Sequence, residues 1–141
     1  MGTGFCRPAS GARSWAAARM LESRLDFMPA ITTHVLDTSR GCPAAGVRVA
    51  LEQVNVDEQW RPVGDGVTDG NGRLNTLLPS STGLAAGLYR LRFDTRAYFQ
   101  EHGVDAFFPQ VIVTFEVSDA SRHYHVPLLL SPFGYTTYRG S

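Results

Sequence analysis

The chain has 141 residues, of which 43% are hydrophobic and 18% are charged, a composition typical of a globular protein that forms one domain with its own core. Thirteen lysines and arginines balance thirteen aspartates and glutamates, so the formal net charge is zero, which argues against a nucleic-acid partner or an anionic membrane. No apolar run approaches the roughly 20 residues of a transmembrane helix, so the sequence predicts no integral membrane protein.

Residues 1–27 differ from the rest of the chain. Arginines are scattered there among alanine, serine and glycine, and a few apolar residues recur at helical spacing. We predict an irregular or disordered N-terminal extension, followed by a domain at 28–141 that begins at Met28. A transit peptide is the alternative, and the acidic residues Glu22 and Asp26 weaken it.

From residue 30 onward the pattern indicates β structure, because alternating apolar and polar runs are separated by Gly, Pro and Asp. Gly64-Asp65-Gly66 interrupts one predicted strand and indicates a bulge or a close backbone approach. Asp69 to Gly72 predicts a tight hairpin turn. The predicted strands cover residues 31–37, 46–54, 60–68, 74–78, 88–93, 111–117 and 124–130.

One helix is predicted, at 96–102, with Thr95 as its N-cap and Gly103 as the residue that ends it. His102 lies at the C-terminal end of this helix, where an imidazolium interacts favourably with the helix dipole, so we interpret it as structural. Short strands with a single helix predict an all-β fold, an antiparallel β-sandwich of two sheets.

The last predicted strand is followed by Ser131-Pro132-Phe133-Gly134, which has the residue preferences of a type I turn. The strand before the turn therefore folds back on the residues after it. Alternation places the apolar residues Tyr124, Val126, Leu128 and Leu130 on one face of this strand, and His123 and His125 on the opposite face.

Three histidines are candidates for chemistry, because imidazole exchanges protons near neutral pH and also binds zinc. His34 shares a strand face with Thr32 and Leu36. His123 and His125 share a face of the last strand. Together the three could be zinc ligands, or they could form a proton-transfer site, and the spacing does not separate these interpretations.

Arg73 directly follows the glycine turn, which could hold its guanidinium near a cleft where it binds an oxyanion. The alternative is a solvated turn arginine. Cys6 and Cys42 are predicted to be free thiols, and a catalytic role for Cys42 would need an activating histidine such as His34. No nucleophile elbow, phosphate loop or Cys-x-x-Cys motif is present.

Four motifs stand out along the domain: THVLD at 33–37, GCPA at 41–44, YHVPLLLS at 124–131 and YRGS at 138–141. With them, the chain from about residue 30 onward resembles the transthyretin-related family of 5-hydroxyisourate hydrolases. The terminal YRGS is the specific part, because the hormone carrier transthyretin shares the fold and the turn region but lacks that ending.

This resemblance implies a transthyretin-type sandwich assembled as a homotetramer, a dimer of dimers with substrate clefts where the dimers meet. The implied reaction is hydrolysis of 5-hydroxyisourate at a ring amide, giving 2-oxo-4-hydroxy-4-carboxy-5-ureidoimidazoline in urate breakdown, with no metal or other cofactor. The implied catalytic residues are His34, Arg73, His125 and Ser141, and the implied substrate-binding residues are His34, Arg73, Tyr138 and Arg139.

In the corresponding hypothesis, His34 and His125 share proton handling: one activates water and the other protonates the leaving ring nitrogen. Arg73 holds the substrate and offsets negative charge. Which histidine is the base is open. The alternatives are a carrier of transthyretin kind and a zinc hydrolase built on His34, His123 and His125. A cytoplasmic location is expected, with a peroxisomal or organellar location as the alternative.

Overall fold

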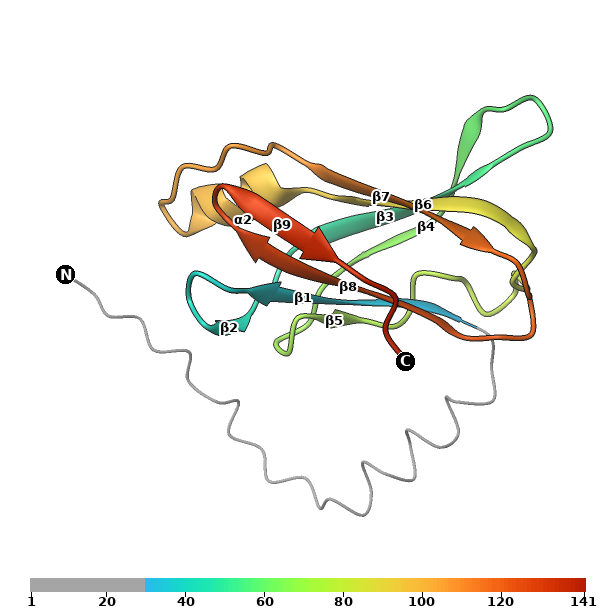
Figure 1. Cartoon of the computed structure of the whole chain (residues 1–141), viewed down its shortest axis with the longest axis horizontal. Helices are drawn as coiled ribbons and strands as arrows, with labels where there is room; N and C mark the ends of the chain where they lie inside the picture. Colours follow the sequence, from blue (N-terminus) through green and yellow to red (C-terminus); the bar gives the residue numbers. More distant parts are fainter. Residues whose placement is uncertain (1–29) are drawn as a thin grey trace, which may run out of the picture.

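The computed structural model describes residues 30–141, which form two sheets facing each other and one short helix (Figure 1). The predicted extension at 1–27 and the predicted domain start at Met28 lie outside the described residues. Among residues 30–141, none of the helical segments has the length and hydropathy of a membrane span. The two sheets and the single helix of the described residues confirm the sandwich that the sequence predicted.

The first sheet is built around β1 (Ile31–Asp37). On one side β1 pairs in parallel with β8 (Tyr124–Ser131), and β9 (Gly134–Thr137) follows beside β8. On the other side β1 pairs antiparallel with two short strands, β2 (Cys42–Pro43) and β5 (Arg73–Leu74). The predicted sandwich thus contains one parallel pair, which joins the first long strand to the last.

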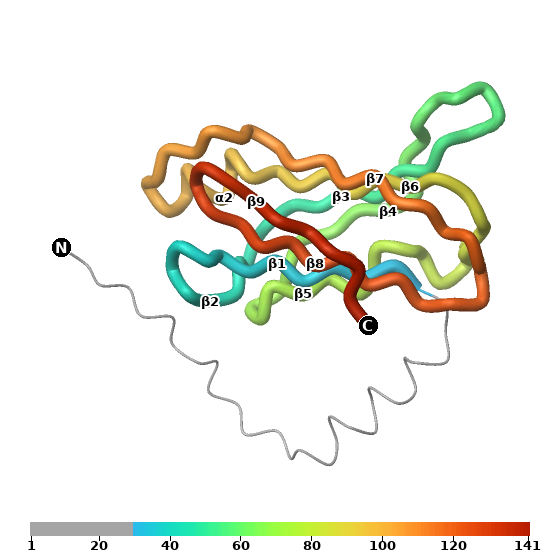
Figure 2. The backbone as a smooth tube through the Cα atoms, viewed as in Figure 1, coloured from blue at the N-terminus to red at the C-terminus, as the bar shows by residue number. Residues whose placement is uncertain are grey.

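The second sheet has the order β4-β3-β6-β7, and all its neighbours are antiparallel. Its strands are β4 (Trp60–Val67), β3 (Arg48–Val54), β6 (Gly87–Phe93) and β7 (Val111–Val117). The tube view shows the hairpin between β3 and β4 projecting away from the two sheets (Figure 2).

The core lies between the two sheets, where the alternation predicted it. On β1, Ile31 and Val35 are fully buried, while the intervening His34 and Leu36 are half-buried on the outer face. The apolar sides of the other strands pack against Ile31 and Val35 in the same core. The buried core residues of β3, β6 and β8 are Val49, Leu51, Tyr89, Leu91, Phe93, Tyr124, Val126, Leu128 and Leu130.

In the region from β4 to β5, two local predictions are confirmed and one is wrong. The β4 strand continues through its glycines, and its register against β3 shifts between Leu51 and Glu52, as expected for a bulge. A β-carbon on Gly64 would lie 1.8 Å from the Leu77 carbonyl oxygen, which confirms the close backbone approach. The strand predicted at 74–78 is shorter, and β5 pairs with β1 rather than with β4.

The helix α2 spans Thr95–Glu101, and its N-cap is Asp94 rather than the predicted Thr95. The Asp94 carboxylate accepts the Ala97 N–H at 3.1 Å, the usual capping bond. The buried Thr95 hydroxyl instead donates to the Phe108 carbonyl at 2.7 Å. Gly103 follows the helix with φ of +65°, as predicted for the residue that ends it.

The prediction of a free thiol at Cys42 is wrong, because Cys42 is disulfide-bonded. Its neighbours Gly41 and Pro43 indicated a turn, but a position in a turn does not determine whether the thiol forms a disulfide bond. Cys42 is 7% exposed and lies in β2 against the end of β1. The prediction for Cys6 falls outside the described residues.

Candidate active site

Strand pairing brings three of the predicted catalytic residues onto one face. In the β1–β5 pair His34 lies opposite Arg73, and in the parallel β1–β8 pair Thr32 lies opposite His125. Residues opposite each other in a ladder point to the same side, as do residues two apart on a strand. The outer face of the first sheet therefore presents two imidazoles and one guanidinium.

The His34 ring is held by a backbone carbonyl of the neighbouring turn. Its Nε2 lies 2.9 Å from the Asn71 carbonyl oxygen. A carbonyl only accepts, so Nε2 carries the hydrogen and Nδ1 is the basic nitrogen of the neutral ring. Burial and the nearby charge of Arg73 lower the pKa of His34, while the Asn71 bond and Asp69 oppose them. His34 is thus favoured in its neutral, basic form.

The turn before Arg73 sets the position of its side chain. The Asp69 carboxylate accepts the Arg73 N–H at 2.9 Å, and the Asp69 carbonyl accepts the Gly72 N–H at the same distance. Gly72 has φ of +73°, and a β-carbon there would lie 2.3 Å from the Val35 carbonyl oxygen, so only glycine fits. The guanidinium then extends from β5 as an exposed cation.

His125 is half-buried and its orientation is determined by Thr32. The Thr32 hydroxyl lies 2.7 Å from His125 Nδ1, which leaves Nε2 as the nitrogen able to meet a substrate. Burial lowers the pKa of His125, and the positive charges of Arg73, His123 and His34 lower it further. The lowered pKa favours the neutral form of His125.

Sequence reasoning missed the contact between Thr32 and the candidate histidines. The Thr32 hydroxyl also lies 3.1 Å from His123 Nε2, so it contacts both His125 on β8 and His123 just before that strand. The available signal was the alternation on β1, which places Thr32 on the same face as His34. Nothing in the local sequence indicated that β8 would pair beside β1.

The C-terminal segment returns along β8. Gly140 pairs with His125 in an isolated bridge, with its N–H 2.9 Å from the His125 carbonyl oxygen. Alternation then places Tyr138 on the His125 side and Arg139 on the opposite side. The Arg139 guanidinium lies 5.0 Å from the centre of the Tyr124 ring, a cation–π contact.

Tyr138 is 55% exposed and Ser141 is exposed at the chain end. The described structure therefore brings the terminal tetrapeptide next to His125 through Gly140. The functional roles of Tyr138, Arg139 and Ser141 stay predictions.

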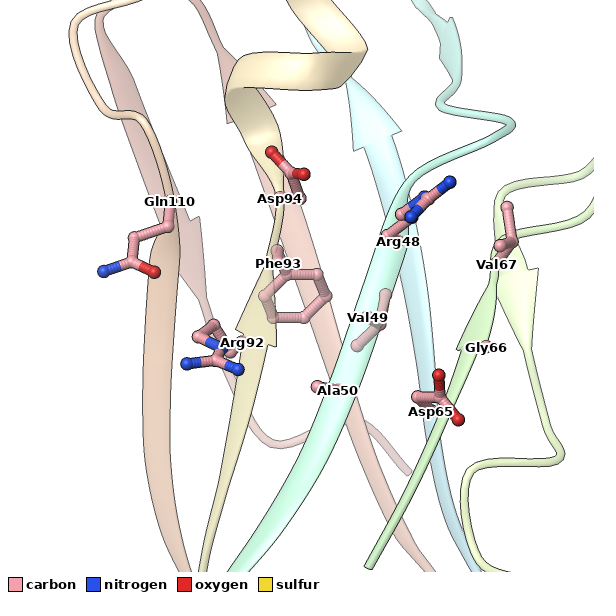
Figure 3. Close-up of a pocket in the computed structure, with 10 residues that line it drawn as sticks. All are labelled: Arg48, Val49, Ala50, Asp65, Gly66, Val67, Arg92, Phe93, Asp94 and Gln110. Carbon is pink, nitrogen blue, oxygen red and sulfur yellow. The ribbon is translucent and has the colours of Figure 1, made fainter. Parts of the chain in front are cut away.

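Two cavities differ in their relation to these residues. A cavity of about 140 Å³ adjoins His125 between β7 and the C-terminal segment, with Tyr138 and Arg139 in its wall. A larger one, about 540 Å³, lies over β4, β3 and β6 of the second sheet, with Gln110 at its edge (Figure 3), and none of the predicted site residues lines it. Side chains such as Arg48, Arg92 and Asp65 surround it.

A zinc site finds no support in this geometry. Residues 30–141 contain no group of three His, Cys, Asp or Glu side chains arranged to hold a metal ion, and Thr32 contacts the facing nitrogens of His123 and His125. His102 is at the end of α2, as predicted, where its Nδ1 donates to the Tyr98 carbonyl at 2.8 Å. It takes no part in the outer face of the first sheet.

The arrangement suits acid–base chemistry on a polar substrate. A neutral imidazole with a free basic nitrogen can take a proton from water, a second imidazole can give a proton, and a guanidinium can hold an oxyanion. The outer face offers these groups from β1, β8 and β5.

Known proteins are similar in sequence to this chain over most of its length. Residues 31–140 match the model of the HIUase/Transthyretin family. The chain is 47% identical to the 5-hydroxyisourate hydrolase of Salmonella typhimurium over 111 residues, 79% of this chain and 80% of the relative. It is 44% identical to the 5-hydroxyisourate hydrolase of Mus musculus over 112 residues, 79% of this chain and 94% of the relative.

Solved structures share the fold. The 5-hydroxyisourate hydrolase of Klebsiella pneumoniae has a TM-score of 0.70 at 36% identity, over 81% of this chain and 100% of that chain. Sea bream transthyretin in complex with thyroxine has a TM-score of 0.74 at 36% identity, over 79% and 94%. The resemblance noted in the sequence is confirmed, and the chain belongs to the HIUase/Transthyretin family.

Proposed function

We propose that the protein is a 5-hydroxyisourate hydrolase, which opens a ring amide of 5-hydroxyisourate to give 2-oxo-4-hydroxy-4-carboxy-5-ureidoimidazoline in urate degradation. The observation that supports it best is the pairing of His34 with Arg73 and of Thr32 with His125 on one sheet face. Relatives named 5-hydroxyisourate hydrolase, at 44% to 47% identity, support the same activity.

In the proposed mechanism His34 is the general base. The Asn71 carbonyl fixes the hydrogen on Nε2, so Nδ1 takes a proton from the attacking water. The lowered pKa of His34 favours the neutral form that this step needs. His34 then carries the positive charge only while the negative tetrahedral intermediate is present.

His125 is the general acid, and Arg73 binds the substrate. With Nδ1 of His125 engaged by Thr32, its Nε2–H protonates the leaving ring nitrogen. The Arg73 guanidinium holds the substrate through its planar fork and offsets the charge on the carbonyl oxygen as water adds. Tyr138 and Arg139 help to bind the ring, and Ser141 contributes hydrogen bonds at the pocket edge.

We also propose a homotetramer, a dimer of dimers. In one chain Arg73 is exposed and His34 and His125 are half-buried, so this face needs a covering surface to exclude water. A second copy of the same face would supply it and form a cleft. Light scattering coupled to size exclusion tests this, and a monomer that is fully active would contradict it.

A carrier of transthyretin kind is the second candidate, because sea bream transthyretin in complex with thyroxine has the same fold. Two imidazoles and a guanidinium make the corresponding face polar here, which favours the hydrolase. A thyroxine titration without binding, together with faster loss of 5-hydroxyisourate absorbance, supports the enzyme. Thyroxine binding without hydrolysis supports the carrier.

The activity is tested by generating fresh 5-hydroxyisourate in a coupled assay and measuring its accelerated decay. Replacing His125 or Arg73 with alanine should reduce turnover about a hundredfold, the effect typical of a lost acid or oxyanion partner. His102→Gln is the matched control, because this histidine lies at the end of α2. Near-native rates in both alanine variants would overturn the assignment.

The cytoplasmic location stays a prediction. Fractionation of the source cells, with a peroxisomal and an organellar marker followed in parallel, measures it directly.

A further inference from the structure

Thr32 lies between the imidazoles of His125 on β8 and of His123 just before β8. Its hydroxyl oxygen is 2.7 Å from His125 Nδ1 and 3.1 Å from His123 Nε2, and the residue is only 6% exposed. His123 is exposed and His125 is half-buried. The threonine hydroxyl therefore connects an imidazole in contact with water to the proposed general acid.

A threonine hydroxyl has one hydrogen to donate and an oxygen that accepts. If it accepted from both rings, its own buried hydrogen would lose a partner, which is costly. The arrangement that satisfies all three groups has Thr32 accepting from one imidazole and donating to the other. The hydrogens on the two rings are then linked through Thr32. If His123 Nε2 carries a hydrogen, His125 Nδ1 carries none, and if His125 Nδ1 carries a hydrogen, His123 Nε2 carries none.

We propose that Thr32 is a positioning residue that couples the protonation of His123 to the tautomer of His125. When His123 is a cation, its Nε2–H donates to Thr32, and Thr32 donates to His125 Nδ1. His125 then holds its hydrogen on Nε2, where the leaving nitrogen of the substrate needs it. This inference deepens the proposed function and rests on it.

The proton transfer balances along the bridge. As His125 Nε2–H passes its proton to the leaving nitrogen, the Thr32 hydrogen moves to Nδ1, and the His123 Nε2 hydrogen moves to the Thr32 oxygen. His123 becomes neutral, and His125 stays neutral throughout. After product release His34 returns its proton to the solvent and Nε2 of His125 takes one up from the solvent, so the hydrogens return through Thr32 and restore the His123 cation.

The charges around His125 explain why such a bridge is useful. Burial disfavours a positive charge on His125, and so do Arg73 on β5, His123 just before β8 and His34 on β1. Asp69 acts on His34 from the turn, and Tyr138 lies on this side of the C-terminal segment. An acid that stays neutral while protons move through Thr32 avoids a cation beside a guanidinium.

Substitutions at Thr32 test the proposal in the full-length protein. Thr32→Val removes the hydroxyl with little change in shape, and Thr32→Ser keeps it. The control is Thr33→Val, which removes a neighbouring buried hydroxyl that donates to the Val126 carbonyl on the inner side of the same strand. All three variants are first compared by thermal unfolding.

We expect Thr32→Val to lower kcat about tenfold with little change in KM, the scale of one lost orienting hydrogen bond. Thr32→Ser should recover most of the loss. Thr33→Val should lower stability but keep the wild-type kcat and pH profile. A wild-type kcat in Thr32→Val, or an equal loss of kcat in Thr33→Val, would overturn the proposal.

The coupling is also measurable without substrate, which separates it from the proposed activity. In protein with ¹⁵N-labelled histidine, nitrogen chemical shifts report which ring nitrogen of His125 carries hydrogen. The His125 tautomer should change as His123 titrates in wild type and in Thr32→Ser, but not in Thr32→Val. If the His125 tautomer in wild type does not change when His123 is protonated, the coupling is disproved. An inactive wild type would disprove only the hydrolase assignment.

Discussion

Gly140 packs directly against the ring of His125. Its N–H donates to the His125 carbonyl at 2.9 Å, and a β-carbon at position 140 would lie 2.5 Å from His125 Cδ2. The imidazole is therefore confined between the Thr32 hydroxyl on its Nδ1 edge and the backbone of the chain end on the other. This contact places the terminal YRGS motif directly beside His125.

Gly140→Ala should reduce turnover without unfolding the protein. The added methyl group overlaps the ring, so either His125 or the terminal segment must move, and a displacement of about 1 Å at a catalytic group can cost about a hundredfold in rate. The measurement is kcat with fresh 5-hydroxyisourate. Gly134→Ala is the control, because the nearest atom to its β-carbon would be 3.7 Å away; equal effects of both variants would contradict the role of Gly140.

Arg73 is expected to act through both its shape and its charge. Its charge lowers the pKa of His34 and of His125. Arg73→Lys keeps the charge but loses the planar fork, so kcat/KM should fall at least tenfold while the pH profile keeps its position.

Arg73→Ala loses the charge as well. Both imidazole pKa values should then rise, and the acidic limb of the pH–rate profile should move to higher pH. Finding the same shift in the lysine variant, or none in the alanine variant, would argue against this electrostatic contact.

Stability should depend on pH through the same two histidines. The pKa of His34 and of His125 in the folded protein lies below the ordinary 6.5, so between these values the unfolded chain binds more protons. Their contribution to stability is present above about pH 6.5 and is lost as the pH falls through the folded values. Urea unfolding at fixed protein concentration should show this decline between pH 7 and pH 5.

The double variant His34→Gln, His125→Gln should have a flatter pH dependence than wild type. His102→Gln serves as the control, since this residue is remote from the site at the end of α2. If the double variant kept the full decline, the two lowered pKa values would not be its source.

Tyr98 supports the fold rather than the chemistry. Its hydroxyl donates to Asp37 Oδ2 at 2.7 Å, and Asp37 is 1% exposed. Burial and this bond raise the pKa of Tyr98 to about 12. Tyr98→Phe leaves a buried carboxylate short of one donor and should reduce the free energy of unfolding by about 1–3 kcal/mol.

Urea unfolding of Tyr98→Phe measures that loss, and kcat should stay close to wild type. Tyr135→Phe removes the same hydroxyl at a residue that is 41% exposed, so it should change stability far less. Equal losses in the two variants would show that the Asp37 bond is not responsible.

The sequence by itself determined the long strands, their buried faces and the identity of the chemical groups. Alternation along 31–37 and 124–130 separates the core side from the histidine side, because a strand buried on one face repeats every two residues. The motifs at both ends of the domain also indicated the family. These are local properties, because they depend only on the residues within one strand and not on its neighbours in the sheet.

Only the tertiary structure decided which groups meet. Thr32 and His125 are 93 residues apart, and they touch because β1 and β8 pair in parallel in one register. The same holds for β5, which pairs with β1 and sets Arg73 opposite His34, and for Gly140 beside His125. Register between distant strands is set by the joint packing of both sheets and by backbone hydrogen bonds, so no local pattern contains it.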